Sequence, residues 1–170
     1  MKSLYSWEEL RSQFRDPPAR WRRAEEFVIE EYGLVEDHGS WHDARAEDDE
    51  PIEIKSCAYE YADGSVGRFA IWEYQWKRLL CTGRLALLVY VPDHTCEVLA
   101  VELLLPHRIA STGKVYEFHH GSMGKRRLRR VPWTEVIPLD AVAFGTRHHF
   151  VDHYSDETVE ETLFMHPPDG

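Results

Sequence analysis

The sequence predicts a single α/β domain with a mixed central sheet flanked by helices, in the order helix, three strands, helix, two strands. Apolar residues recur at helical spacing between Ala19 and Tyr32. Residues 85–91 form a continuous apolar run, which is typical of a strand buried on both faces of a sheet. A chain of 170 residues that is 43% hydrophobic can build one domain, here residues 1–170, around a sizeable core.

Two helices are predicted at the N-terminal end. Residues 1–16 form a short helix that Ser6 caps. The second helix runs from Ala19 to Tyr32 and ends at Gly33, because glycine readily adopts the conformation that closes a helix. Its apolar stripe comprises Trp21, Ala24, Phe27, Val28 and Tyr32.

Glu25 is an acid within this apolar stripe. It lies four residues after Trp21 and three before Val28, whereas Glu26 points away from the stripe. An acid that faces a core costs free energy unless another group compensates it. Glu25 is therefore a candidate functional residue.

The middle of the chain is predicted to hold three strands and a helix. Residues 40–45 and 51–61 form a hairpin across a turn whose acidic residues are solvated. Residues 67–72 form a third strand, and residues 73–80 form a helix that ends near Gly83.

Two clearer strands follow, at residues 85–91 and 96–105. They complete a predicted core over residues 19–105. Residues 106–170 form a C-terminal extension of unassigned role, with a short helix at 107–110 and a strand at 114–119.

The extension also contains a basic run and a terminal helix that begins near Ser155. Five of the six residues 125–130 are basic, which is more typical of a solvated strand or loop than of a nucleic-acid contact. The six tryptophans are expected mainly in the core, although Trp133 beside the run could stack on an unpaired base. The candidate nucleic-acid-binding residues are Lys125, Arg126, Arg127, Arg129, Arg130 and Arg68.

The formal charge of -10, from 30 acidic and 20 basic residues, at first disfavours a polyanionic partner such as DNA. Only five of the basic residues are lysines, a composition that resembles proteins of salt-in halophiles. At about 1 M salt the Debye length is roughly 3 Å, so the acidic surface would repel a phosphate very little. The acidic composition therefore indicates a high-salt habitat and does not indicate which ligand the protein binds.

The composition also bears on the compartment. Three cysteines without a CxxC pair favour reduced thiols over disulfides or a structural zinc site. No apolar run approaches the roughly 18 residues of a membrane helix, and the first residues lack a signal-peptide pattern. We expect a cytoplasmic protein that does not contact a membrane.

The strongest chemical pattern is Asp43 followed ten residues later by Glu53-Ile54-Lys55. Successive side chains of a strand point to opposite faces, so Glu53 and Lys55 share one face. Two carboxylates beside an ammonium can hold a divalent cation, activate a water and neutralise charge on a phosphate.

This pattern and the order of elements resemble the PD-(D/E)xK nuclease superfamily, which has the restriction-endonuclease-like fold. In such enzymes the first acid ends one strand and the Glu-x-Lys lies on its hairpin partner, as Asp43, Glu53 and Lys55 would here. His42 stands where the proline that names the motif would be. Glu25 is similar to an acid that archaeal Holliday-junction resolvases and their relatives place near the metal. Gln75 corresponds to a glutamine that some branches add on the second helix.

The resemblance implies a metal-dependent deoxyribonuclease that hydrolyses phosphodiester bonds of DNA. Asp43, Glu53 and the carbonyl of Ile54 would bind magnesium or manganese, with Glu25 joined through water. Lys55 would polarise the attacking water or steady the phosphate. Many enzymes of this superfamily act as dimers, because two strands need two cuts, so the resemblance also allows a homodimer.

Other interpretations stay open. A Glu-x-Lys on a strand is usually a solvated cross-strand pair. A member that binds nucleic acid or protein without cutting would keep the same fold. A zinc site could form from histidines at a helical spacing in residues 148–153, although no familiar zinc motif accompanies them. His119 and His120 are a second histidine pair.

Overall fold

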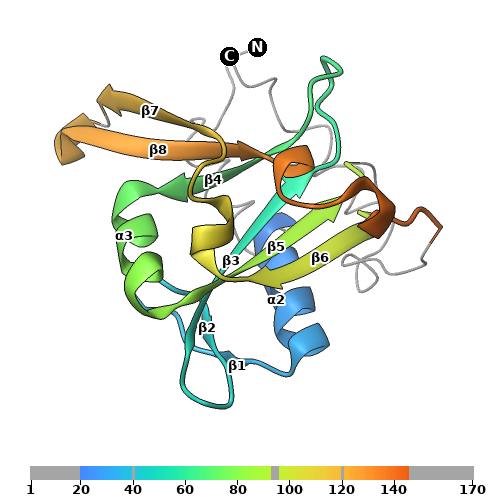
Figure 1. The fold of residues 1–170 in the computed structure, drawn as a ribbon, viewed down its shortest axis with the longest axis horizontal. Coiled ribbons are helices and arrows are strands. Elements are labelled where there is room, and N and C mark those ends of the chain that lie inside the picture. Colours follow the sequence, from blue (N-terminus) through green and yellow to red (C-terminus); the bar gives the residue numbers. More distant parts are fainter. Residues whose placement is uncertain (1–19, 40, 93–95, 120, 146–170) are drawn as a thin grey trace, which may run out of the picture.

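The computed structural model describes residues 20–145, except residues 40, 93–95 and 120 (Figure 1). The predicted helix at 1–16, the predicted terminal helix and the histidines of residues 148–153 lie outside the described residues. No helix in the described part is long and apolar enough to cross a membrane. The helices and strands are α2 (Arg20–Tyr32), β1 (Val35–Glu36), β2 (Ala44–Arg45), β3 (Pro51–Ala58), β4 (Arg68–Trp72), α3 (Glu73–Thr82), β5 (Arg84–Tyr90), β6 (Val98–Leu104), β7 (Lys114–His119) and β8 (Lys125–Pro132).

The strands form two sheets. The five-stranded sheet has the order β1-β2-β3-β5-β6, and the three-stranded sheet has the order β4-β8-β7. Strand β5 runs parallel to β3 and antiparallel to β6, so the central sheet is mixed, as predicted. Four short 3-10 turns join the remaining segments, at Pro106–Ile109, Gly121–Met123, Trp133–Glu135 and Leu139–Ala141.

Strand β5 is the centre of the core and is buried on both faces, as its apolar run predicted. Leu85, Leu87 and Val89 pack on one face with residues of α3, β4 and β8, and Ala86 and Leu88 pack on the other face with residues of α2. Helices α2 and α3 therefore cover opposite faces of the five-stranded sheet (Figure 1).

Helix α2 forms where the apolar spacing predicted it, but only the middle of the stripe is buried. Ala24 and Val28 are fully buried against the sheet. Trp21 is 53% exposed and Tyr32 is 38% exposed, so the prediction that they belong to the buried stripe was wrong. Trp21 lines a surface pocket, and Tyr32 ends the helix with its hydroxyl 3.5 Å from the carbonyl of Val101.

Two features differ from the predicted order of elements. The third predicted strand is β4, which pairs with β8 in the second sheet and does not extend the central hairpin. The central sheet instead gains β1, whose two residues are both exposed and therefore give no hydrophobic signal. The described part of the chain accordingly has four strands before α3, where the sequence predicted three.

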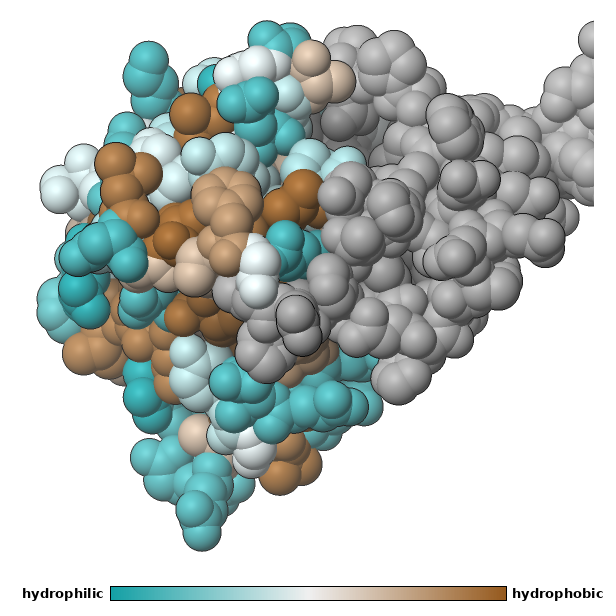
Figure 2. Space-filling model, turned by 90° about the vertical axis from the view of Figure 1, so that its right-hand side faces the viewer, coloured by the Kyte–Doolittle hydropathy of each residue, from teal (hydrophilic) through white to brown (hydrophobic). Residues whose placement is uncertain are grey.

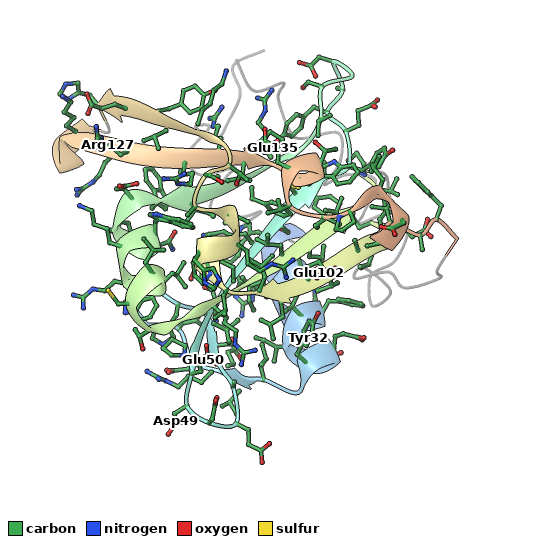
Figure 3. The ribbon with its side chains drawn as sticks, viewed as in Figure 1. Tyr32, Asp49, Glu50, Glu102, Arg127 and Glu135 are labelled. Atoms are coloured by element: carbon green, nitrogen blue, oxygen red, sulfur yellow. The ribbon has the colours of Figure 1, made fainter. Side chains whose placement is uncertain are left out.

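The turn between β2 and β3 is solvated, as its acidic residues predicted. Asp49 lies at the lower end of the molecule in Figure 3. The lowest part of the surface in Figure 2 is hydrophilic. Asp49 has a positive φ of 64°, which a short polar side chain tolerates in a tight turn.

Gly67 joins the two sheets where β4 begins. Its N–H donates to the Tyr59 carbonyl at 3.2 Å, and its carbonyl accepts from the Trp133 N–H at 3.1 Å. The Trp133 indole donates to the Tyr59 carbonyl at 2.8 Å. Trp133 is 2% exposed, so the prediction that it could stack on a base was wrong: the ring fills the core.

Replacing Gly67 by alanine should destabilise the fold strongly. An added Cβ would lie 1.5 Å from the Ala58 carbonyl oxygen, so the junction between the sheets would have to move. We expect a loss of at least about 3 kcal/mol in the free energy of unfolding, measured by urea denaturation. The neighbouring and exposed Val66→Ala should cost less than about 1 kcal/mol. Equal losses in the two variants would contradict this account of Gly67.

Candidate active site

The site begins at an open edge of β3. Strand β2 pairs with β3 only at Ile52 and Pro51, so the edge beyond Ile52 has no strand partner among the described residues. The Asp43 backbone N–H donates to the Ile52 carbonyl at 3.0 Å. The Asp43 side chain then takes the place of the missing strand, because its Oδ2 accepts the Ile54 N–H at 2.9 Å. This pair of hydrogen bonds fixes the Asp43 carboxylate at the edge.

The backbone carbonyl of Ile54 faces the same edge. In a strand the N–H and C=O of one residue point to the same side, and the Ile54 N–H points to Asp43. A backbone oxygen and a carboxylate therefore share the open edge. Both are ligands that hard divalent cations prefer.

Glu53 lies next to this edge and is almost fully buried, with 1% of its surface exposed. Its Oε1 accepts hydrogen bonds from Lys55 Nζ at 2.6 Å and from Gln75 Nε2 at 2.6 Å. Its Oε2 is also buried, and no donor in the described part of the chain reaches it. A buried carboxylate oxygen without a donor can accept a cation without losing any hydrogen bond.

Gln75 holds Glu53 from helix α3. Its side-chain carbonyl accepts the Trp72 N–H at 3.2 Å, which caps the start of the helix, while its amide donates to Glu53. Both ends of the Gln75 side chain are therefore occupied, and its orientation is fixed. Gln75 acts on the site as a positioning residue through Glu53.

Glu25 approaches the site from α2. One ligand atom each of Glu25, His38 and Asp43 lies within 4.8 Å of the others. Burial, followed by repulsion from Asp43 and Glu53, raises the pKa of Glu25 to about 8. Burial also raises the pKa of Glu53 to about 7, although Lys55 partly offsets this effect. Carboxylates that resist ionisation beside one another are stabilised when a cation joins them.

His38 is a site residue that the sequence did not reveal. Its Nε2 lies 2.8 Å from Glu36 Oε1 and its Nδ1 lies 3.8 Å from Asp43 Oδ1. The loop that carries it is held by the hydrogen bond from the Asp37 N–H to the Asp43 carbonyl, at 3.0 Å. A histidine five residues before Asp43 belongs to no known motif. The short strand β1 is the only local feature that could have pointed to His38 as a site residue.

His42, which stands at the position of the motif proline, supports the same loop. It is 7% exposed, and its Nε2 lies 3.2 Å from an oxygen of Asp37, which also accepts from Arg45. A Cβ at Gly39 would lie 2.2 Å from the His42 ring. His42 therefore packs inside the loop and shapes the backbone on which Asp43 lies.

A pocket of about 270 Å³ opens beside these groups. Elements α2, β3 and β4 line it, so the pocket spans both sheets. Its lining residues are Trp21, Glu25, Ile54, Lys55, Ser56, Arg68 and Ala70. The pocket thus places Lys55 and Glu25 within reach of a ligand and adds the guanidinium of Arg68.

The structure brings together most of the residues that the sequence singled out. Direct contacts join Asp43 to Ile54, and Glu53 to Lys55 and Gln75. Glu25 and Arg68 lie on the same pocket. The predicted basic run is strand β8 of the second sheet, where none of its residues lines the pocket.

The sequence matches the family model of the PD-(D/E)XK nuclease superfamily domain over residues 14–138. The match covers most of the chain and includes β7 and β8 as well as the carboxylate site. A search of curated proteins finds no match.

The raised pKa of Glu25 predicts how the stability of the metal-free protein depends on pH. The folded-state pKa of about 8 exceeds the ordinary value of 4.5, so the folded state binds more protons between these values. Stability should therefore fall as pH rises from about 4.5 to about 8. Glu25→Gln removes this charge, so in chelator its melting temperature should exceed that of the wild type at pH 9 and equal it near pH 4, below both pKa values.

The matched control is Glu30→Gln, which changes an exposed glutamate of the same helix. Its melting temperature should follow the wild type at both pH values, measured by calorimetry. If the melting temperature of Glu25→Gln runs parallel to that of the wild type at all pH values, the charge of Glu25 does not destabilise the fold at high pH.

Proposed function

Because this chain belongs to the PD-(D/E)XK nuclease superfamily, we propose that it hydrolyses DNA phosphodiester bonds with the help of a magnesium or manganese ion. The observation that carries the proposal is the meeting of Asp43, Glu53 and Lys55 at the open edge of β3. Glu25 lines the adjoining pocket. Membership of the superfamily supports nuclease chemistry in general. DNA as the substrate and magnesium or manganese as the ion are parts of what we propose.

The donor set fits a hard divalent cation. Asp43, Glu53 and the Ile54 carbonyl would hold the ion, and Glu25 would join through water. Carboxylate and carbonyl oxygens suit magnesium and manganese better than zinc or copper. The bound ion would lower the pKa of a water and offset charge on phosphate oxygens. His38 adds a nitrogen near Asp43, and manganese accepts such a ligand more readily than magnesium does.

The protein's own groups have distinct tasks. The Lys55 Nζ contacts Glu53 Oε1 at 2.6 Å, and Lys55 borders the pocket in which a phosphate would lie. There it would donate to the attacking water or to a phosphate oxygen and stabilise negative charge in the transition state. Gln75 keeps Glu53 oriented, and the burial of Glu53 excludes water from its carboxylate. The Arg68 guanidinium would bind the phosphate from the β4 side.

Binding of the ion should be measurable without any substrate. At a manganese concentration about 100 times the dissociation constant, the ion should stabilise the fold by about 2.7 kcal/mol. Asp43→Asn should abolish most of this stabilisation in a thermal melt. Asp48→Asn, which removes the same charge from the solvated turn, should keep it. Equal stabilisation of both variants would place the ion elsewhere.

Cleavage tests the chemistry. Purified protein with magnesium should cut labelled duplex, flap or four-way DNA. We expect Asp43→Asn, Glu53→Gln and Lys55→Met each to lower the cleavage rate by at least about 10²-fold, the scale of losing one electrostatic contact in a closed site. Asp48→Asn should cut at the wild-type rate.

Two outcomes would contradict the proposal. Undiminished cleavage by Asp43→Asn would remove the site from the reaction. Manganese binding without cutting of any DNA would instead indicate the second interpretation, a domain that keeps the fold and binds nucleic acid without hydrolysing it.

A further inference from the structure

The three-stranded sheet divides its basic residues between two faces. Alternate residues of a strand share a face, and paired residues of neighbouring strands point to the same side. Ala70 pairs with Arg130, and Arg130 pairs with Lys114. We call the face that carries Arg68, Ala70, Lys114, Tyr116, Arg126 and Arg130 the pocket-side face. We call the face that carries Ile71, Lys125, Arg127, Arg129 and Glu117 the helix-side face.

The cations of the helix-side face are already engaged. Glu117 accepts from Lys125 Nζ at 2.6 Å and lies 3.3 Å from Arg127 Nε. Arg129 lies 4.7 Å above the Trp76 ring of α3, and its guanidinium donates to the Thr112 carbonyl at 3.1 Å. Figure 3 places Arg127 near the outer end of the sheet, far from the central sheet. These residues stabilise the hairpin and its packing on α3.

The cations of the pocket-side face form no ion pair with an acid of the described residues. Arg68, Lys114, Arg126 and Arg130 are all exposed and form no ion pair there, and this face carries no acidic residue on the three strands. Arg130 lies 5.5 Å from the centre of the Tyr116 ring. In a chain with a formal charge of -10, an acid-free row of cations is complementary to a polyanion.

This row is continuous with the pocket. Arg68 and Ala70 line the pocket beside Lys55 and Glu25, and the register places Arg130 next to Ala70 on β8. Arg126 lies four residues further along β8, which corresponds to roughly 13 Å at about 3.3 Å per residue. The cations therefore extend from the pocket along the hairpin of β7 and β8, which projects beyond α3 (Figure 1).

We propose that the pocket-side face binds the phosphates of the nucleic-acid strand whose scissile bond enters the pocket. Arg130 and Arg126 contact successive parts of that strand, and Arg68 contacts the phosphate nearest to Lys55. The helix-side face takes no part, although the sequence assigned its residues to the same basic run. This inference rests on the proposed function for its substrate and adds which residues hold that substrate.

Two double variants with the same change in charge test the proposal. Arg126→Gln with Arg130→Gln removes two cations from the pocket-side face. Lys125→Gln with Arg127→Gln removes two from the helix-side face. Both are made in the Asp43→Asn chain, so that a labelled, branched DNA stays intact while its binding is measured by anisotropy over a series of KCl concentrations. Thermal melts establish that each variant is folded at the assay temperature.

The pocket-side variant should bind at least about tenfold more weakly, and its slope of log affinity against log [KCl] should fall by about 2, since each phosphate contact contributes about 0.9. The helix-side variant should keep the affinity and slope of its parent. In the cleaving wild-type background, the pocket-side variant should raise KM and leave kcat unchanged, because its contacts are remote from the reacting phosphate.

Equal losses in the two double variants would overturn the proposal, because net charge alone would then explain binding. A loss confined to the helix-side variant, an unchanged pocket-side variant, or no DNA binding by the parent chain would overturn it as well. If the pocket-side variant alone loses binding while the wild type cuts no DNA with any metal, the face assignment stands and the proposed hydrolysis fails.

Discussion

The hydrogen bond from the Ile54 N–H to Asp43 Oδ2 is the interaction on which the site depends. A strand edge exposes backbone groups that need partners, and β2 stops pairing with β3 after Ile52. Asp43 meets that need with its side chain. The carboxylate that completes the sheet is thereby fixed beside the Ile54 carbonyl and close to Glu53, where it can also bind a cation. The hydrogen bond that completes the sheet edge therefore also positions two of the proposed metal ligands, the Asp43 carboxylate and the Ile54 carbonyl.

The rest of the site combines elements that are distant in sequence. Helix α2 contributes Glu25 from one face of the central sheet, and α3 contributes Gln75 from the other. The second sheet contributes Arg68, which its junction at Gly67 places beside the pocket. The energetic cost is concentrated in Glu25 and Glu53, whose pKa values are raised by burial and by repulsion from neighbouring acids. A functional site often lowers the stability of the fold, so this cost is expected where acids are held together to bind an ion.

Sequence reasoning found the parts of the molecule with a strong local signal. The buried run of β5 and the helix α2 follow from hydrophobic spacing, and the spacing from Asp43 to Lys55 indicated the site. It missed β1 and His38, because two exposed residues and a lone histidine have no periodicity. It could not tell which face of the basic run borders the pocket either, since that depends on which strand pairs with β8. Register across non-neighbouring strands is a tertiary property.

A crystal structure with manganese, read by anomalous scattering, tests the central claim most directly. We expect one strong peak at direct coordination distance from carboxylate oxygens of Asp43 and Glu53 and from the Ile54 carbonyl oxygen, with Glu25 beside it. The buried Glu53 Oε2, which has no donor in the described part of the chain, should face the ion. A peak at the solvated turn between β2 and β3, with none at the open edge of β3, would contradict the account.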